Sequence, residues 1–109
     1  MTLAISIIQM DISFGDPQTN FEIAEQKIKE ACQQKTDIIV LPELWTTGYD
    51  LTRLNEISDK SAQKTISFLQ KMAMDYHVHL VGGSIANQKE NGIYNTLIII
   101  NKHGELVHT

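Results

Sequence analysis

The chain has 109 residues, of which 42% are hydrophobic and 20% are charged, a composition typical of a single globular domain. The formal net charge is −4 and the nine basic residues are scattered, so we expect no nucleic acid and no membrane surface as partner. No apolar run approaches the ~20 residues of a membrane span, and the single cysteine fits a reducing compartment, so we expect a cytoplasmic protein.

The first part of the chain predicts a strand, a helix and a second strand. Residues 3–10 are β-rich and apolar on both alternating faces, which indicates a central strand. An amphipathic helix follows, and Thr19 and Glu22 have the spacing of a capping box at its start. Residues 37–41 form a second apolar strand. A strand, a helix and a strand in this order predict a right-handed parallel crossover.

The second part of the chain predicts one more helix and three strands. Residues 50–59 indicate a loop with a short helical turn, and residues 61–76 carry the apolar stripe of a helix. Residues 80–85 and 93–100 are the third and fourth strands, joined by a polar turn. A fifth strand begins at Glu105. We therefore expect an α/β fold with parallel and antiparallel strands.

Two features inside the later strands need a physical explanation. Gly82 and Gly83 indicate the close approach of another backbone or side chain to the third strand. Their spacing fits no phosphate-binding loop, which a flavodoxin-like binding module of this length would need. Asn95 lies within the fourth strand. Its amide either holds neighbouring backbone or the loop after the second strand, or it marks the strand's entry and faces solvent.

The stretch after the second strand carries the main catalytic candidate. Pro42 lacks an N–H and ends regular strand pairing, so Glu43 stands where a hydrophobic strand opens into a loop. Ligands bind at this carboxyl end of strands in α/β sheets. Apolar surroundings would raise the pKa of the Glu43 carboxyl, as a general acid or base requires, whereas the alternative is a solvated loop carboxylate. Trp45 and Tyr49 either line a pocket or close the edge of the core.

Other chemistry-bearing residues are better explained by structure. Cys32 lies on the buried stripe near a helix end, where an apolar environment and the helix C-terminus disfavour a thiolate. His77 and His79 would share a strand face as a possible metal pair. However, His77 follows the end of a helix and no third ligand is near in sequence, so we expect no metal.

Three motifs carry a resemblance to a known family. Leu41-Pro42-Glu43-Leu44-Trp45 followed by Thr47-Gly48-Tyr49 resembles the first catalytic motif of the carbon-nitrogen hydrolase (nitrilase) superfamily, and most closely its omega-amidase-like branch. Gly82-Gly83-Ser84 and Tyr94-Asn95-Thr96 also resemble that family. The resemblance implies that residues 1–109 are the N-terminal portion of a nitrilase-type four-layer α-β-β-α sandwich, with a mixed sheet and two main helices.

The resemblance also implies an activity. Glu43 corresponds to the glutamate of a Glu-Lys-Cys triad that cleaves a small amide, here an omega-amide of a carboxylic acid, without a metal or other cofactor. Trp45 and Tyr49 are then candidates for substrate binding, and Asn95 for support of the site. Neither Lys102 nor Cys32 matches the remaining triad positions. We therefore expect an incomplete N-terminal portion that is inactive alone.

Self-association is a further expectation. We expect the apolar fourth strand, residues 93–100, to lie at or near an unprotected position, and an exposed edge invites pairing with another chain. A homo-oligomer is the predicted state. The alternative from a non-enzymatic class is a structural or regulatory remnant that pairs with a full-length partner.

Overall fold

A parallel β-α-β unit begins the fold. The structure, a computed structural model, describes residues 2–109. Strands β1 (Ile5–Ile7) and β2 (Ile38–Val40) pair in parallel, and helix α1 (Pro17–Ala31) connects them. Among the described residues, no helix is both long and apolar enough to cross a membrane.

The predicted capping box at the start of α1 is wrong. The N-cap is Asp16, whose carboxylate accepts hydrogen bonds from the Thr19 backbone N–H at 3.2 Å and from Thr19 Oγ1 at 2.7 Å. Pro17 then occupies the first helical position, where its missing N–H costs nothing and its fixed φ favours the helix. Asp16 therefore satisfies the first turn, and Glu22 is not needed as a cap.

The remaining elements build a mixed sheet, as the sequence predicts. The strand order is β1-β2-β4-β5-β6, with β1, β2 and β4 parallel, β4-β5 and β5-β6 antiparallel, and β3 paired in parallel with β4. The two-residue strand β3 is too short for a sequence pattern to reveal it. These elements are α2 (Leu54–Ile57), β3 (Asp59–Lys60), α3 (Gln63–Tyr76), β4 (His79–Lys89), β5 (Gly92–Ile100) and β6 (Leu106–His108).

Of two predictions about strand position, one is wrong and one is confirmed. The first strand is not central, because β1 lies at the edge of the described sheet and its Ile5 and Ile7 are 59% and 75% exposed. The fourth strand does lie near an unprotected position, because within the described residues β6 pairs only with Ile99 and Ile100 and leaves the rest of the outer edge of β5 unpaired. The hydrophobicity of a strand does not show whether it has a neighbour on both sides within the sheet. A strand at the edge is equally apolar when one of its faces packs against a further layer of protein.

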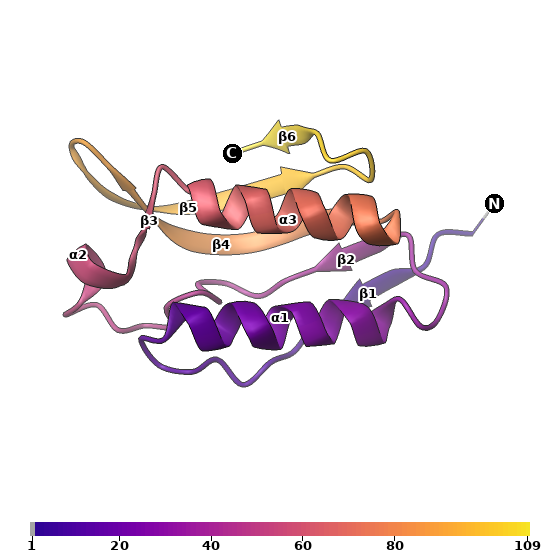
Figure 1. Cartoon of the computed structure of the whole chain (residues 1–109), viewed down its shortest axis with the longest axis horizontal. Helices are drawn as coiled ribbons and strands as arrows, with labels where there is room; N and C mark the ends of the chain where they lie inside the picture. Colours follow the sequence, from indigo (N-terminus) through magenta and orange to yellow (C-terminus); the bar gives the residue numbers. More distant parts are fainter. Residues whose placement is uncertain (1) are drawn as a thin grey trace.

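Helices α1 and α3 lie side by side over one face of the sheet (Figure 1). Phe21 of α1 and Phe68 of α3 make an edge-to-face contact, with ring centroids 5.1 Å apart. Beneath the helices, Ile39, Leu80 and Ile100 occupy one row across β2, β4 and β5, and none of them is exposed. The core of the described chain therefore lies between the two helices and this face of the sheet.

The opposite face of the sheet is apolar, and no helix among residues 2–109 covers it (Figure 1). Ile7, Val40, Val81 and Ile99 form the row next to the buried one, because successive side chains in a strand point to opposite faces. Leu97, two residues from Ile99, is 41% exposed on the same side of β5. An exposed apolar area of this kind is typical of a surface that packs against further protein.

A β-bulge at Gly82 and Gly83 brings β4 against the turn after β2. Gly83 adopts a φ of +63°, and a Cβ there would collide with the Pro42 carbonyl oxygen and lie 2.7 Å from that of Leu41. A Cβ on Gly82 would lie 2.9 Å from the Ile98 carbonyl oxygen. The predicted close approach of backbone to these glycines is confirmed, and it fixes where the turn that carries Glu43 lies.

A pair of glycine substitutions tests this contact. Gly83→Ala should lower the free energy of unfolding by roughly 3 kcal/mol or more, because it adds a backbone collision to the cost of a positive φ. Gly48 has the same φ of +63°, but its nearest contact is the flexible side chain of Ile12 at 3.3 Å. Gly48→Ala should therefore cost only about 1–2 kcal/mol. Equal losses in urea unfolding would contradict the proposed close contact.

Candidate active site

Glu43 lies in the turn after β2, and β4 holds this turn on both sides of the carboxylate. Before it, the Ser84 N–H donates to the Pro42 carbonyl oxygen at 3.4 Å. After it, the Leu44 N–H donates to Ser84 Oγ at 3.1 Å. Leu44 has a φ of +47°, which is uncommon for a residue with a side chain, and such backbone strain is concentrated at functional sites. The backbone at Glu43 is therefore fixed by its neighbours.

The Glu43 side chain is exposed and lies close to Tyr49. The sequence predicts apolar surroundings for this carboxylate, but residues 2–109 do not bury it. Tyr49 is 59% exposed. The negative charge of Glu43 raises the pKa of the Tyr49 phenol, with a smaller contribution from desolvation, because ionisation would place two negative charges together. The loop thus brings together two of the site residues that the sequence predicted.

Trp45 is a core residue in this structure. Its side chain is completely buried, and its Nε1–H donates to the Gly82 carbonyl oxygen at 2.8 Å. Its ring packs edge-to-face on Phe21, with centroids 5.2 Å apart, and lies 5.8 Å from Phe68. Of the two roles considered for Trp45, the structure places it in the core, and no part of its indole is left exposed for a substrate.

Asn95 is exposed on β5, opposite Ala86 of β4. It lines a cavity of about 170 Å³ together with Leu44, the residue that follows Glu43. Within residues 2–109 the Asn95 amide makes no hydrogen bond, so the expected bond to the Glu43 turn is absent there. The polar group is instead free at the wall of the cavity beside that turn.

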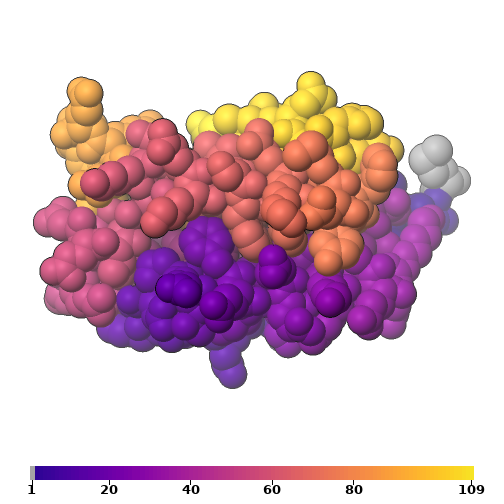
Figure 2. Space-filling model, viewed as in Figure 1, coloured from indigo at the N-terminus to yellow at the C-terminus, as the bar shows by residue number. Residues whose placement is uncertain are grey.

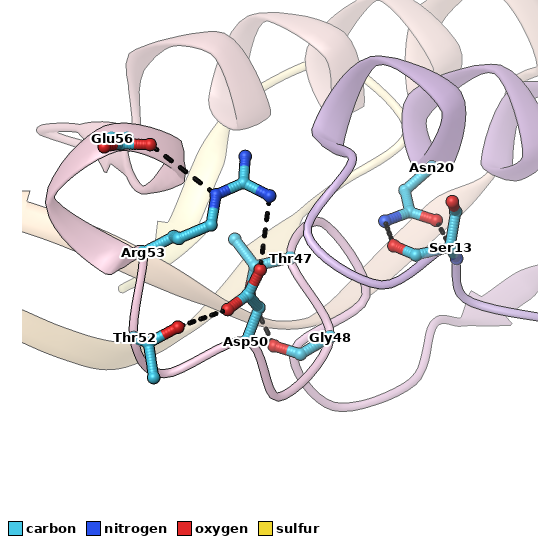
Figure 3. Close-up of polar contacts among 8 residues, drawn as sticks. All are labelled: Ser13, Asn20, Thr47, Gly48, Asp50, Thr52, Arg53 and Glu56. Carbon is cyan, nitrogen blue, oxygen red and sulfur yellow. Dashed lines mark hydrogen bonds and ion pairs between the residues drawn. The ribbon is translucent and has the colours of Figure 1, made fainter.

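Asn20 ties helix α1 to the same loop through Thr46 and to the segment before the helix through Ser13, the second of which is drawn in Figure 3. This fully buried side chain accepts from the Ser13 N–H at 2.6 Å and donates to the carbonyl oxygens of Ser13 at 2.8 Å and Thr46 at 2.9 Å. Its role was not predicted from the sequence. The signal was a polar side chain on the stripe of Ala24 and Ile28, both fully buried, at a helical spacing of four residues.

Asp50 organises the end of the loop (Figure 3) and was also missed. It is 4% exposed, accepts a hydrogen bond from Thr52 Oγ1 at 3.1 Å, and lies 3.4 Å from Arg53 Nη1. Gly15 has a φ of +65°, and a Cβ there would collide with Asp50 Oδ2. The Gly15 N–H also donates to the Thr47 carbonyl oxygen at 2.8 Å. The loop is therefore fixed at several points along its length.

Cys32, His77 and His79 have structural positions, as the sequence predicts. Cys32 caps the C-terminus of α1, and partial burial raises the pKa of its thiol, which disfavours the nucleophilic thiolate. His77 caps α3 in a left-handed conformation, so it is outside the strand that holds His79. His79 Nδ1 accepts a hydrogen bond from the Lys102 backbone N–H at 3.2 Å. The two histidines therefore do not share a strand face.

A mixed sheet with helices over one face is an α/β architecture, and the fixed carboxylate of Glu43 follows a strand at the end where such sheets bind ligands. The chain belongs to the carbon-nitrogen hydrolase family, whose pattern it matches over residues 4–109. It is 43% identical, over 98% of its length, to a 2-oxoglutaramate amidase from Bacillus subtilis (strain 168), and covers 41% of that protein. It is 29% identical to omega-amidase NIT3 of Saccharomyces cerevisiae, with 96% of this chain and 39% of that protein covered.

Solved structures show the same fold. The crystal structure of Saccharomyces cerevisiae Nit3, a member of branch 10 of the nitrilase superfamily, aligns with a TM-score of 0.85 and 27% identity. The alignment covers 96% of this chain and 42% of that one. The family resemblance and the α/β fold class with a mixed sheet and two main helices are thus confirmed. The chain spans about 41% of the length of the B. subtilis amidase and of a Staphylococcus aureus hydrolase to which it is 37% identical.

The proximity of Glu43 and Tyr49 is testable by titration. Glu43→Gln removes the negative charge that opposes phenol ionisation, so the pKa of Tyr49 should fall toward the ordinary tyrosine value of 10.0. The titration can be followed by NMR of the labelled tyrosine ring in the intact protein, with Tyr76 as the internal control. An unchanged pKa for Tyr49 would show that the two side chains are apart.

Proposed function

We propose that Glu43 is the general base of an amidase of the carbon-nitrogen hydrolase family, acting with a lysine and a cysteine that residues 1–109 do not supply. One observation carries this proposal. Glu43 stands in the matching motif with its carboxylate exposed, in a turn whose backbone is held by Ser84 on both sides. A rigid backbone and an accessible carboxylate are what a proton-transferring group needs.

The proposed reaction follows from these roles. Glu43 accepts the proton of the cysteine thiol, and the resulting thiolate attacks the amide carbon. The lysine stabilises the oxyanion of the tetrahedral intermediate. Glu43 then donates its proton to the departing nitrogen, which leaves as ammonia and gives a thioester. A water molecule loses its proton to Glu43, attacks the thioester and releases the acid, and the proton returns to the thiolate.

The substrate we propose is a small omega-amide of a carboxylic acid. Support comes from the relatives, which are named 2-oxoglutaramate amidase and omega-amidase. We further propose that Tyr49 contacts the substrate and that Asn95 supports the site, because both side chains are exposed near the Glu43 turn.

We propose that the apolar face of the sheet, which carries Ile7 and Leu97, packs against the second sheet of a four-layer sandwich. Their exposed fractions of 75% and 41% support this, since burial of a large apolar side chain contributes roughly 1.5–3 kcal/mol. A cytoplasmic location remains part of the proposal, on the composition and the single unpaired cysteine. A homo-oligomer also remains part of it, because most of the outer edge of β5 is unpaired within the described residues and such an edge invites pairing with another chain.

Substitution of Glu43 tests the activity. In the intact protein, Glu43→Gln should lower kcat for 2-oxoglutaramate by roughly 10²–10⁴-fold, because general acid–base catalysis contributes about that much. Glu43→Asp keeps the carboxylate but shortens its reach, so its loss should be smaller. Turnover is measured as ammonia release, and far-UV circular dichroism verifies the fold.

The control is Glu90→Gln, which removes a carboxylate from the exposed β4-β5 turn and should leave turnover unchanged. A Glu43→Gln enzyme with wild-type kcat would reject the assignment of Glu43. A wild-type protein that releases ammonia from simple aliphatic amides but not from 2-oxoglutaramate would reject only the substrate.

A further inference from the structure

Ser84 of β4 bonds both of the peptide groups that flank Glu43. The Pro42 carbonyl oxygen, which accepts from the Ser84 N–H at 3.4 Å, belongs to the peptide group before the Glu43 Cα. The Leu44 N–H, which donates to Ser84 Oγ at 3.1 Å, belongs to the peptide group after it. Because each peptide group is planar, the orientations of these two planes set the φ and ψ angles of Glu43. Those angles in turn set the direction in which the Glu43 side chain leaves the backbone.

The β-bulge of β4 brings both groups of Ser84 to the same turn. A residue in a regular strand directs its N–H along the sheet and its side chain away from the sheet. The register between β4 and β5 shifts between Val81 and Ser84, and within this interval Gly83 has a φ of +63°. The bulge therefore lets Ser84 bond the turn after β2 with its backbone N–H and with its hydroxyl.

The hydroxyl bond acts on a strained residue. Leu44 has a φ of +47°, which is unfavourable for a residue with a Cβ. Its carbonyl oxygen accepts from the Gly48 N–H at 2.8 Å. The next residue, Trp45, is completely buried against aromatic side chains of α1 and α3, and the side chains of these two helices meet over that face of the sheet (Figure 2). The backbone after Leu44 is thus held by the core, and the Ser84 hydroxyl extends this hold to the peptide group that follows Glu43.

We propose that Ser84 is a positioning residue for Glu43, whose hydroxyl fixes the ψ angle of Glu43 and thereby orients the carboxylate. This inference rests on the general-base role proposed above. Proton transfer requires the two heavy atoms to approach to hydrogen-bond distance, and a misplacement of about 1 Å can cost roughly 10²-fold in rate. Alanine at position 84 would leave the Leu44 N–H without its partner, so the peptide group after Glu43 would be free to rotate.

The kinetic test measures ammonia release from 2-oxoglutaramate by variants of the intact protein. Ser84→Ala should lower kcat roughly 10- to 100-fold and change KM by less than about twofold, because the carboxylate loses its orientation while no substrate contact is removed. Ser84→Thr keeps a hydroxyl and should retain most of the wild-type kcat.

Ser6→Ala is the matched control. Ser6 is also a half-buried serine in a strand, and its Oγ donates to Thr36 Oγ1 at 2.8 Å. Thr36 precedes β2, whereas Glu43 follows β2, so this hydrogen bond is at the other end of the strand. Ser6→Ala should therefore leave kcat unchanged.

The pKa of the Tyr49 phenol supplies a readout that does not depend on activity. The charge of Glu43 raises this pKa, so a carboxylate that has lost its orientation should raise it less. Ser84→Ala should therefore lower the pKa of Tyr49 toward 10.0, measured by NMR of the labelled ring, whereas Ser6→Ala should not. In the Glu43→Gln background, Ser84→Ala should change neither this pKa nor kcat, because no carboxylate is left to orient.

The outcomes separate this inference from the proposed function. A Ser84→Ala protein with wild-type kcat and a wild-type pKa for Tyr49 would overturn the positioning role, even with Glu43→Gln inactive. Equal losses of kcat in Ser6→Ala, or a loss that persists in full in the Glu43→Gln background, would overturn it too, because the hydroxyl would then contribute only to stability. An active Glu43→Gln enzyme would reject the general base, whereas a lowered Tyr49 pKa in Ser84→Ala would still support the orientation of the carboxylate by Ser84.

Discussion

The contact between the turn after β2 and the bulge of β4 is the constraint on which the site depends. Gly83 has no Cβ, so the Pro42 carbonyl can approach it, and Ser84 then bonds the backbone before and after Glu43. Trp45 reinforces the same contact from the core by donating to the Gly82 carbonyl oxygen. A carboxylate with an exposed side chain thereby gains a fixed backbone, which a surface loop would not give it.

The loop from Glu43 to Asp50 has different environments along its length. Glu43 and Tyr49 are exposed and close together, whereas Thr46 is buried. Hydrogen bonds from Asn20 and the packing of Trp45 separate these environments. One loop therefore carries an exposed carboxylate on one side and a buried hydroxyl on the other.

Several parts of the fold and the site could be predicted from local sequence. Apolar periodicity located both main helices and four of the strands to within a few residues, because burial imposes that pattern. The cap of α1 was misassigned because two local patterns compete there, and Asp16-Pro17 is the stronger. The roles of Asn20 and Asp50 were not predicted. Asn20 bonds Thr46, which is 26 residues away, and Asp50 packs against Gly15 in another loop, so no local pattern reveals either contact.

The sequence by itself determined the position of Glu43 after an apolar strand and the need for glycine at positions 82 and 83, because both follow from rules about neighbouring residues. Only the tertiary structure decided that Trp45 belongs to the core and that β1 lies at the edge of the described sheet. It also decided that Thr46 is buried, with no hydrogen-bond partner for its hydroxyl among residues 2–109. These outcomes depend on which elements pack together. The burial of a residue depends on segments that are distant from it in the chain. The pattern within one segment carries no information about those other segments.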